Sequence, residues 1–188
     1  MPHISLGNDW PGIVSLFAYR PEAAKPMTDL VDLMLRGPNS LSPGERELIG
    51  TYVSGLNECS FCTNSHAAFA AAQLPEGMAL VDQVRSDPDT APVSPKMHAL
   101  LRIAGAVQRG GKNVTDADVA AARQAGATDV EIHDTVLIAA MFCMANRYVD
   151  GLGTWAPPQL EIYRANAAEI VAHGYEAVTE SATAVVTP

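Results

Sequence analysis

The sequence predicts an all-α fold of about eight helices. Alanine is abundant, the alternation of apolar and polar residues that marks strands is scarce, and helix-capping patterns recur along the chain. With 188 residues, of which 48% are hydrophobic, the chain is long enough to form one domain with a sizeable core. We expect an N-terminal arm over residues 1–22, a helical domain over 23–175 and a C-terminal tail over 176–188.

The arm is rich in proline and glycine, and this composition predicts an extended conformation. The next segment, EAAKPMTDLVDLMLRG, has apolar residues at helical spacing, and Gly37 and Pro38 favour a stop at its end. The apolar face of this first helix is expected to hold Met27, Leu30, Leu33 and Met34.

Three further helices are predicted from their capping residues. Ser42, followed by Pro43 and then Glu45 at the third helical position, indicates a capping box at the start of one helix. Ser94 is the expected cap of a second helix, and Thr115 that of a third. The apolar stripe of the helix that starts at Ser94 is expected to hold Leu100, Ile103, Ala104 and Val107.

Four other segments complete the predicted fold. A helix is expected to begin near Glu58 or Cys59 and to end at Pro75, and a shorter one follows within PEGMALVDQVRSD. The segment TDVEIHDTVLIAAMFCMANRYVDGLG predicts a long, strongly apolar helix at the centre of the domain. After Pro157 and Pro158, QLEIYRANAAEIVAHG predicts one more amphipathic helix.

The charge of the chain bears on its partners. The net charge is −9 and no cluster of Lys or Arg occurs, which argues against nucleic acid and anionic membranes as partners. The apolar runs are shorter than a membrane span and the sequence does not open like a signal peptide, so we expect a cytoplasmic protein. Three cysteines in a reducing compartment do not make a disulfide framework, and two of them at C-x-x-C spacing favour catalysis or metal binding.

The segment NECSFCTNSH contains three of the candidate reactive residues of the chain. On a helix, Cys59 and Cys62 lie three residues apart and His66 lies four residues after Cys62, so all three share one face. Cys59 lies at the expected helix start, where free N–H groups and the helix dipole favour a thiolate. Glu47, on the preceding helix, is positioned to orient His66 or to take a proton through it.

Alternative interpretations exist for each of these residues. The two cysteines could be buried apolar residues, and Glu47 could be a solvated surface glutamate. Two thiolates, an imidazole and a carboxylate could also bind zinc, although the second ligand pair of ordinary structural zinc sites is missing. The register of Glu47 with the cysteines and His66 favours a redox-active pair over both alternatives.

The segment ERELIGTYVSGLNECSFCTNSH resembles the signature of the AhpD-like alkylhydroperoxidases, which belong to the carboxymuconolactone decarboxylase superfamily. The family pattern, Glu followed after eleven residues by C-x-x-C-x-x-x-H, matches Glu47, Cys59, Cys62 and His66 without a gap. The segments LFAYRPE and VEIHDTVLIAAMFCMANRYVDGLG are similar to the longer, peroxidase-related members, so the resemblance covers roughly residues 10–155.

The resemblance implies an all-helical homo-oligomer (dimer, trimer or hexamer) with thiol peroxidase activity and no metal, flavin or haem cofactor. One cysteine thiolate reduces a hydroperoxide, its partner closes a disulfide, and an external dithiol or dithiol-bearing protein restores the pair. Glu47 and His66 are implied as a proton relay. We assign Cys62 as the attacking thiolate because it lies one helical turn from His66, and Cys59 as the resolving one, although the helix start favours ionisation of Cys59.

Two other functions stay open at this point: a decarboxylase acting on a carboxymuconolactone-like ring, and a thiol redox sensor without catalysis. The remaining candidate residues are expected to have structural roles. Cys143 is predicted to be a buried, inert thiol, and Tyr52 a core residue. Asn146 and Arg147 are expected in structural or subunit contacts, and His98, His133 and His173 at the surface or in packing.

Overall fold

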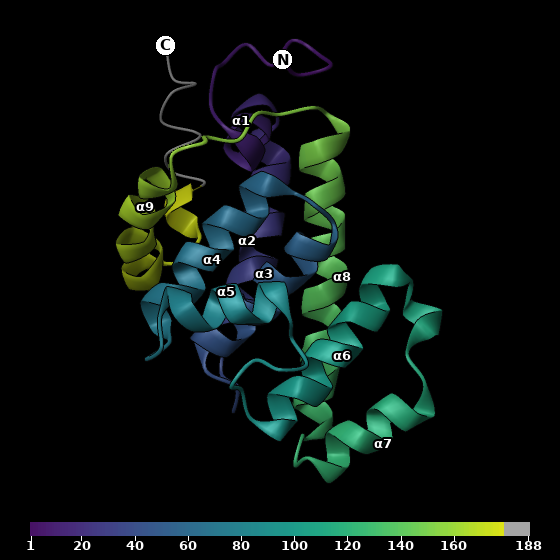
Figure 1. The fold of residues 1–188 in the computed structure, drawn as a ribbon. Coiled ribbons are helices and arrows are strands. Elements are labelled where there is room, and N and C mark those ends of the chain that lie inside the picture. Colours follow the sequence, from purple (N-terminus) through teal and green to yellow (C-terminus); the bar gives the residue numbers. More distant parts are fainter. Residues whose placement is uncertain (179–188) are drawn as a thin grey trace.

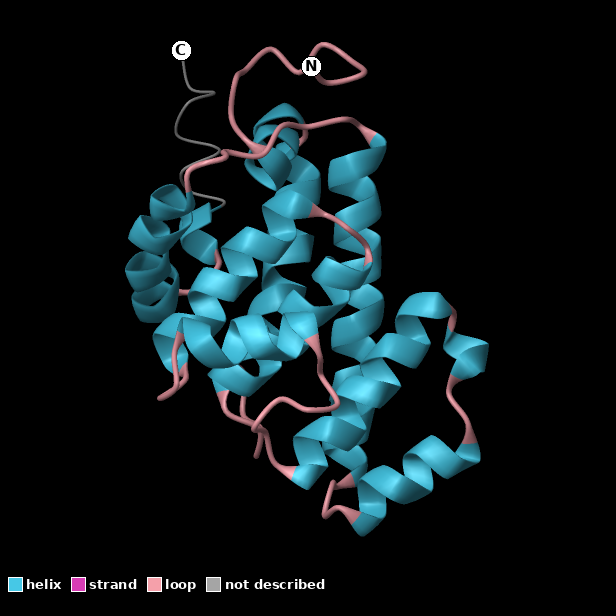
Figure 2. Cartoon of the chain, in the orientation of Figure 1, coloured by secondary structure: helices cyan, strands magenta, loops and turns pink. Residues whose placement is uncertain are grey.

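The structure, a computed structural model, describes residues 1–178 and is entirely helical in that part of the chain, without strands (Figures 1 and 2). It has nine α-helices and one short 3₁₀-helix in these residues. The helices are α1 (Gly12–Tyr19), α2 (Pro21–Arg36), α3 (Pro43–Leu56), α4 (Ser60–Gln73), α5 (Met78–Ser86), α6 (Pro95–Arg109), η1 (Gly111–Asn113), α7 (Asp116–Gln124), α8 (Asp129–Gly151) and α9 (Leu160–His173).

The centre of the fold is formed by α3, which packs against α4, α6 and α8. The long helix α8 runs along one side of the molecule, α9 covers α4 on the other, and α6 and α7 extend at one end (Figure 1). No helix among the described residues has both the length and the apolar character needed to cross a membrane. The all-α prediction is confirmed, and each of the predicted helices is present.

The predicted caps are also confirmed. Ser42 accepts a hydrogen bond from the backbone N–H of Glu45, whose side chain accepts one from the Ser42 backbone N–H, so the capping box is complete. Ser94 caps α6 through the N–H of Met97, and Thr115 caps α7 in a second capping box. Leu100, Ile103, Ala104 and Val107 are all buried, as their spacing predicts.

The helix α1 was not predicted, and it contradicts the prediction of an extended arm over residues 1–22. Pro11 occupies the N-cap of α1, outside the helix, where its missing N–H costs no hydrogen bond. Gly12 has φ +53, and a Cβ at this position would lie 2.2 Å from the ring of Phe61. The proline and glycine that suggested an extended arm therefore mark the start of a helix that packs against α2 and α8 and approaches Phe61 of α4 at Gly12.

One residue of α2 lies on the wrong side of the predicted face. Leu33 is 63% exposed, whereas the buried stripe follows Ala24, Thr28 and Leu35. These positions are spaced four and seven residues apart, so they form one helical face, and Leu33, two residues before Leu35, points away from it. Of the predicted tail, residues 179–188 lie outside the described part of the chain.

The turn between α3 and α4 places the first cysteine of the motif. Glu58, directly after the C-cap Asn57, has φ +59, a left-handed conformation that residues other than glycine rarely adopt. The N–H of Cys59 reaches back to the carbonyl of Ser54. The end of α7 has the same hydrogen-bond pattern with Gly126 (φ +91) in the left-handed position, as is usual for such helix ends.

The two turns form a matched pair for a stability measurement. We expect Glu58→Gly to raise the free energy of unfolding by about 1 kcal/mol, because glycine has no Cβ to strain this conformation. Gly126→Ala should lower the free energy of unfolding by a similar amount, since no neighbouring atom lies within 4 Å of the added Cβ and the effect reports the backbone alone. Urea denaturation measures both, and a Glu58→Gly protein no more stable than wild type would contradict the strain at this turn.

Candidate active site

The buried carboxylate of Glu47 organises the site. Glu47 lies on α3 and is only 1% exposed. Its Oε2 lies 2.7 Å from Nδ1 of His66 on α4, and its Oε1 accepts a hydrogen bond of 2.6 Å from the hydroxyl of Tyr175. With Nδ1–H donating to the carboxylate, Nε2 of His66 is left as the nitrogen that can exchange a proton with another group.

Tyr175 is a member of this site that the sequence analysis missed. It follows α9 after Gly174, its backbone N–H donates to Asp32 Oδ1 on α2, and its hydroxyl also lies 3.1 Å from Nδ1 of His66. Burial and the neighbouring Glu47 carboxylate raise the pKa of Tyr175 well above its ordinary value. Tyr175 therefore stays protonated and donates its hydrogen to Glu47.

Aromatic rings hold the imidazole of His66 in place. Phe142 and Phe69 meet it edge-on with centroid distances of 4.5 Å and 5.4 Å, and Tyr175 stacks on it at 5.8 Å. A ring packed on several sides and hydrogen-bonded at Nδ1 has little rotational freedom. The expected contact between Glu47 and His66 is thus present, and it is held in one orientation.

The two cysteines of the motif occupy different environments. Cys59 is the N-cap of α4 and is fully buried, whereas Cys62, one turn later, lines a cavity together with His66. Cys59, Cys62 and Cys143 are all free thiols. A small molecule that enters the cavity would therefore meet Cys62 before Cys59.

The hydrogen bond between the two sulfurs separates their acidities. That bond, followed by burial, raises the pKa of the Cys59 thiol far above its ordinary value. The same bond lowers the pKa of the Cys62 thiol; nearby His66 and a hydrogen bond from Asn146 add to this effect, and burial opposes it. The helix start, which favoured ionisation of Cys59 on sequence grounds, is outweighed by the interaction with Cys62 and by burial, which both raise the pKa of Cys59.

A chain of hydrogen-bonded side-chain amides orients the amide N–H of Asn146 toward the sulfur of Cys62. Nε2 of Gln108 donates to the carbonyl oxygen of Leu56, which can only accept, and to Oδ1 of Asn57 at 2.9 Å. The Nδ2 of Asn57 must then face Asn146, and it donates to Oδ1 of Asn146 at 2.8 Å. This leaves Nδ2 of Asn146 for Ser54 Oγ, at 3.1 Å, and for the sulfur of Cys62.

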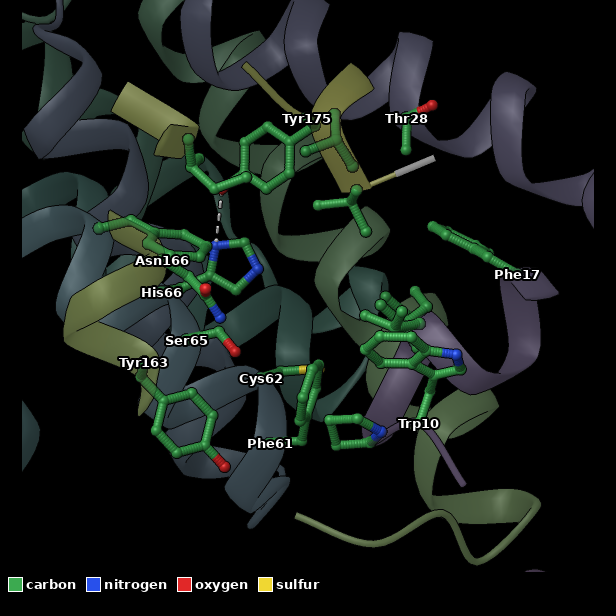
Figure 3. A pocket seen from close by; sticks show the side chains of 18 of the residues that line it. Trp10, Phe17, Thr28, Phe61, Cys62, Ser65, His66, Tyr163, Asn166 and Tyr175 are labelled. Atoms are coloured by element: carbon green, nitrogen blue, oxygen red, sulfur yellow. Dashed lines mark hydrogen bonds between the residues drawn. The ribbon is translucent and has the colours of Figure 1, made fainter. Parts of the chain in front are cut away.

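The cavity beside Cys62 has a volume of about 660 Å³ and is lined mainly by apolar side chains. Figure 3 shows Cys62 and His66 on one wall, with Trp10 and Phe17 from the N-terminal segment on another and Tyr163 and Asn166 from α9 beside them. The N-terminal segment is fastened there by the N–H of Gly12, which donates to the carbonyl of Trp155. Residues predicted to form an arm thus form part of the site.

The other candidate residues lie outside this group. Tyr52 packs against the core as predicted, while Cys143 is only half-buried and accepts a weak hydrogen bond from Asn57. A buried pairing of Arg147 with a carboxylate, one of the structural roles considered, is wrong: its guanidinium is exposed and donates to the carbonyl of Cys143. Three histidines lie away from the cysteine pair: His98, which bonds the carbonyl of Pro88, and the exposed His133 and His173.

The zinc interpretation gains no geometric support. Within residues 1–178, no group of three or more His, Cys, Asp or Glu side chains is arranged to hold a metal ion. In the site, Nδ1 of His66 and both oxygens of Glu47 are engaged with one another and with Tyr175.

Comparisons with known proteins agree with the family resemblance that the sequence motif carries. Residues 21–74, which include Glu47, Cys59, Cys62 and His66, match the sequence model of the carboxymuconolactone decarboxylase family. An uncharacterized peroxidase-related protein from Ralstonia eutropha JMP134, described as an alkylhydroperoxidase AhpD core, is 27% identical with a TM-score of 0.74, over 82% of this chain and 81% of that one. An uncharacterized peroxidase-related protein from Silicibacter sp. TM1040 is 25% identical with a TM-score of 0.73, over 82% of this chain and 78% of that one. No curated protein matches the sequence.

The amide chain leads to a prediction on the acidity of Cys62. Asn146→Asp should raise the pKa of Cys62 by at least about one unit, because a carboxylate oxygen replaces the N–H that faces the sulfur. Asn146→Ala, which only removes the donor, should raise it less. The pH dependence of alkylation, followed by mass spectrometry in a Cys143→Ser background, measures this pKa.

Asn113→Asp serves as the charge-matched control, since Asn113 lies on the exposed η1. It should leave the alkylation profile unchanged. An Asn146→Asp protein that is folded by circular dichroism and alkylates like wild type would show that the amide does not act on the sulfur.

Proposed function

We propose that this chain, which carries a carboxymuconolactone decarboxylase family domain of the AhpD-like kind, is a thiol-dependent peroxidase that reduces hydroperoxides through a Cys59–Cys62 dithiol/disulfide cycle. The observation that carries the proposal is the placement of Cys62. Its thiol has a lowered pKa and lines an apolar cavity beside His66, which is in turn hydrogen-bonded to the buried Glu47. The similarity to peroxidase-related proteins adds support.

The first step takes place at Cys62. His66 accepts the thiol proton, and the thiolate attacks one oxygen of the peroxide, so that an S–O bond forms as the O–O bond breaks. The sulfur is oxidised by two electrons to a sulfenic acid, and the peroxide is reduced to an alkoxide. The proton held by His66 then passes to the alkoxide, which leaves as a neutral alcohol.

The second step uses Cys59. Its thiol condenses with the sulfenic acid of Cys62, which forms the disulfide and releases water. An external dithiol, or a protein that carries one, restores both thiols by exchange and is itself oxidised to a disulfide. Cys59 suits the resolving role because it is fully buried and hydrogen-bonded to the sulfur of Cys62. We retain the homo-oligomer and the cytoplasmic location as further parts of the proposal.

Glu47 and Tyr175 support the proton transfer. The carboxylate of Glu47 fixes the tautomer of His66 and stabilises the imidazolium that forms when the thiol ionises. Tyr175 does not touch the sulfur, so we treat it as a positioning residue that holds the Glu47 carboxylate in place.

The roles of the two cysteines are tested by single substitutions. Cys62→Ser should abolish the reaction with cumene hydroperoxide. Cys59→Ser should retain the first step and stop at a sulfenic acid that dimedone traps at Cys62. Mass spectrometry and thiol counting after one equivalent of peroxide measure both, and wild type should yield a Cys59–Cys62 disulfide. Cys143→Ser should behave like wild type.

Loss of reaction in Cys59→Ser with retention in Cys62→Ser would reverse the assignment. Thiols that survive excess peroxide in the wild-type protein would remove the peroxidase proposal. Repeated turnover of peroxide with dihydrolipoamide as reductant indicates catalysis. If the protein is oxidised once and dihydrolipoamide does not support further cycles, the result favours a redox sensor instead.

The relay is tested by Glu47→Gln and Tyr175→Phe. Glu47→Gln should slow the oxidation of Cys62 by about a hundredfold, in the range of lost acid–base assistance. Tyr175→Phe should slow it by roughly tenfold, because a hydrogen bond to a charged group contributes about 1.5–3 kcal/mol. Tyr175→Phe should also move the acid limb of the pH–rate profile for Cys62 oxidation to higher pH, because the Glu47 carboxylate loses a hydrogen bond that stabilises its charged form. Loss of packing alone does not produce this shift.

Tyr52→Phe provides the matched control for Tyr175→Phe, since Tyr52 packs against the core away from the cysteines. Its rate and its pH profile should equal those of wild type. If Tyr175→Phe also leaves the pH profile in place, Tyr175 has only a structural role.

A further inference from the structure

The chain after α9 reverses at Gly174 and brings Tyr175 back toward the centre of the fold. Gly174 is the C-cap of α9, with φ +80 and ψ −170, a backbone conformation that essentially only glycine adopts. Tyr175 is only 6% exposed, and its hydroxyl reaches Glu47 on α3. The position of this hydroxyl therefore depends on how the turn at Gly174 is held.

Two side chains of α2 hold this turn from both sides. Before the turn, Nη1 of Arg36 donates to the carbonyl oxygens of Ile170 and Val171, at 2.9 Å and 3.1 Å, in the last turn of α9. A cation is favourable at this end of a helix, where the dipole is negative and carbonyl groups lack helical partners. After the turn, Oδ1 of Asp32 accepts a hydrogen bond of 3.0 Å from the backbone N–H of Tyr175.

The two side chains also support one another. Asp32 and Arg36 are one helical turn apart on α2, and Nε of Arg36 lies 3.5 Å from Oδ1 of Asp32. Only 33% and 27% of these side chains are exposed, so solvent and salt screen the ion pair less than a pair at the open surface. A Cβ at position 174 would lie 2.8 Å from Oδ1 of Asp32 and 3.1 Å from Nε of Arg36, so the turn and the pair fit closely together.

The path from this pair to the site runs through Tyr175. Neither Asp32 nor Arg36 is among the described residues that line the cavity beside the cysteines. Tyr175, by contrast, donates its hydroxyl hydrogen to Glu47 and stacks its ring on His66, beside which it lies in Figure 3. A hydrogen bond weakens steeply once its geometry departs from the optimum. A shift of the Tyr175 backbone would therefore weaken the bond to the carboxylate.

We infer that Asp32 and Arg36 are positioning residues of the active site. They fix the turn at Gly174 and thereby hold the hydroxyl of Tyr175 against the carboxylate of Glu47. The inference rests on the proposed peroxidase function, in which this carboxylate orients the imidazole of the site. It adds α2 to the elements that set the reactivity of the cysteine pair.

Single substitutions test the two side chains. Asp32→Leu removes the acceptor and should slow the oxidation of Cys62 by cumene hydroperoxide by roughly fivefold, with the acid limb of the pH–rate profile at higher pH. Arg36→Met, which removes the donors to α9, should act in the same direction. Asp32→Asn should stay within about twofold of wild type, because its carbonyl oxygen can still accept from the Tyr175 N–H. Asp29→Leu, at an exposed position of α2, is the control and should equal wild type.

A double-mutant cycle separates positioning from general destabilisation. If Asp32 acts through Tyr175, the combination of Asp32→Leu with Tyr175→Phe should be no slower than Tyr175→Phe alone, since the hydroxyl that Asp32 positions is already absent. Effects of the two substitutions that multiply would show that they act independently, and this result would overturn the inference.

The turn itself is tested by two glycine substitutions. Gly174 and Gly126 both have positive φ, so alanine strains the backbone at each. Only at position 174 does the added Cβ also displace Asp32, because nothing lies within 4 Å of a Cβ at position 126. Gly174→Ala should therefore slow the oxidation of Cys62 as Asp32→Leu does, whereas Gly126→Ala should leave the rate unchanged. Equal rates in the two alanine variants would contradict the role of the turn.

Hydrogen exchange of the Tyr175 amide, followed by NMR, distinguishes a failure of this inference from a failure of the proposed function, because it needs no peroxide. In the reduced protein, Asp32→Leu should speed this exchange by at least about tenfold and Asp32→Asn should retain the protection. Unchanged protection of the amides of α3 shows that the variants are folded.

Two results of this measurement decide between the claims. A Tyr175 amide that Asp32→Leu leaves as protected as in wild type would overturn the inference. If the amide responds as expected but the wild-type protein does not react with peroxide, the peroxidase proposal falls, and the positioning of Tyr175 by α2 stands.

Discussion

The buried carboxylate of Glu47 is the constraint on which the rest of the site depends. A carboxylate that loses its water is tolerated only where hydrogen-bond donors replace it. Here one donor comes from His66 on α4, and the other from Tyr175, which is 128 residues away in the sequence. The positions of α4 and of the chain after α9 relative to α3 are therefore tied to a single charge, and the same hydrogen bonds that satisfy it orient the imidazole.

The orientation of hydrogen bonds also separates two cysteines that are only three residues apart. Cys59 donates to Cys62, so one thiol is made a poor acid by the contact that makes the other a good one. The amide of Asn146 also lowers the pKa of Cys62. Its orientation is fixed by the chain of hydrogen bonds that runs from the carbonyl of Leu56 through Gln108 and Asn57. The difference between the sulfurs thus originates in α3, α6 and α8, as well as in the motif helix.

Sequence patterns predicted the local features of this fold and missed the long-range ones. The capping box at Ser42 and the shared face of Cys59, Cys62 and His66 depend on residues three or four positions apart, which the chain itself displays. Tyr175 enters the site only through contacts with distant helices, and no local pattern marks it. The helix α1 was missed because its proline and glycine lie at its start, a position that composition alone does not distinguish from an extended arm.

The arrangement places Cys62 and His66 on one wall of a cavity whose lining is otherwise mainly apolar. A low-dielectric environment strengthens the attraction between an imidazolium and a thiolate, but it also penalises the thiolate itself. Of the groups that stabilise the Cys62 sulfur, Asn146 and Cys59 lie outside the lining of the cavity, whereas His66 lines the cavity beside the sulfur. A ligand that fills this cavity can then exclude water from the Cys62 sulfur without displacing Asn146 or Cys59. In the reaction that we propose, the negative charge passes from the thiolate to the leaving oxygen, and His66 supplies the proton that neutralises it.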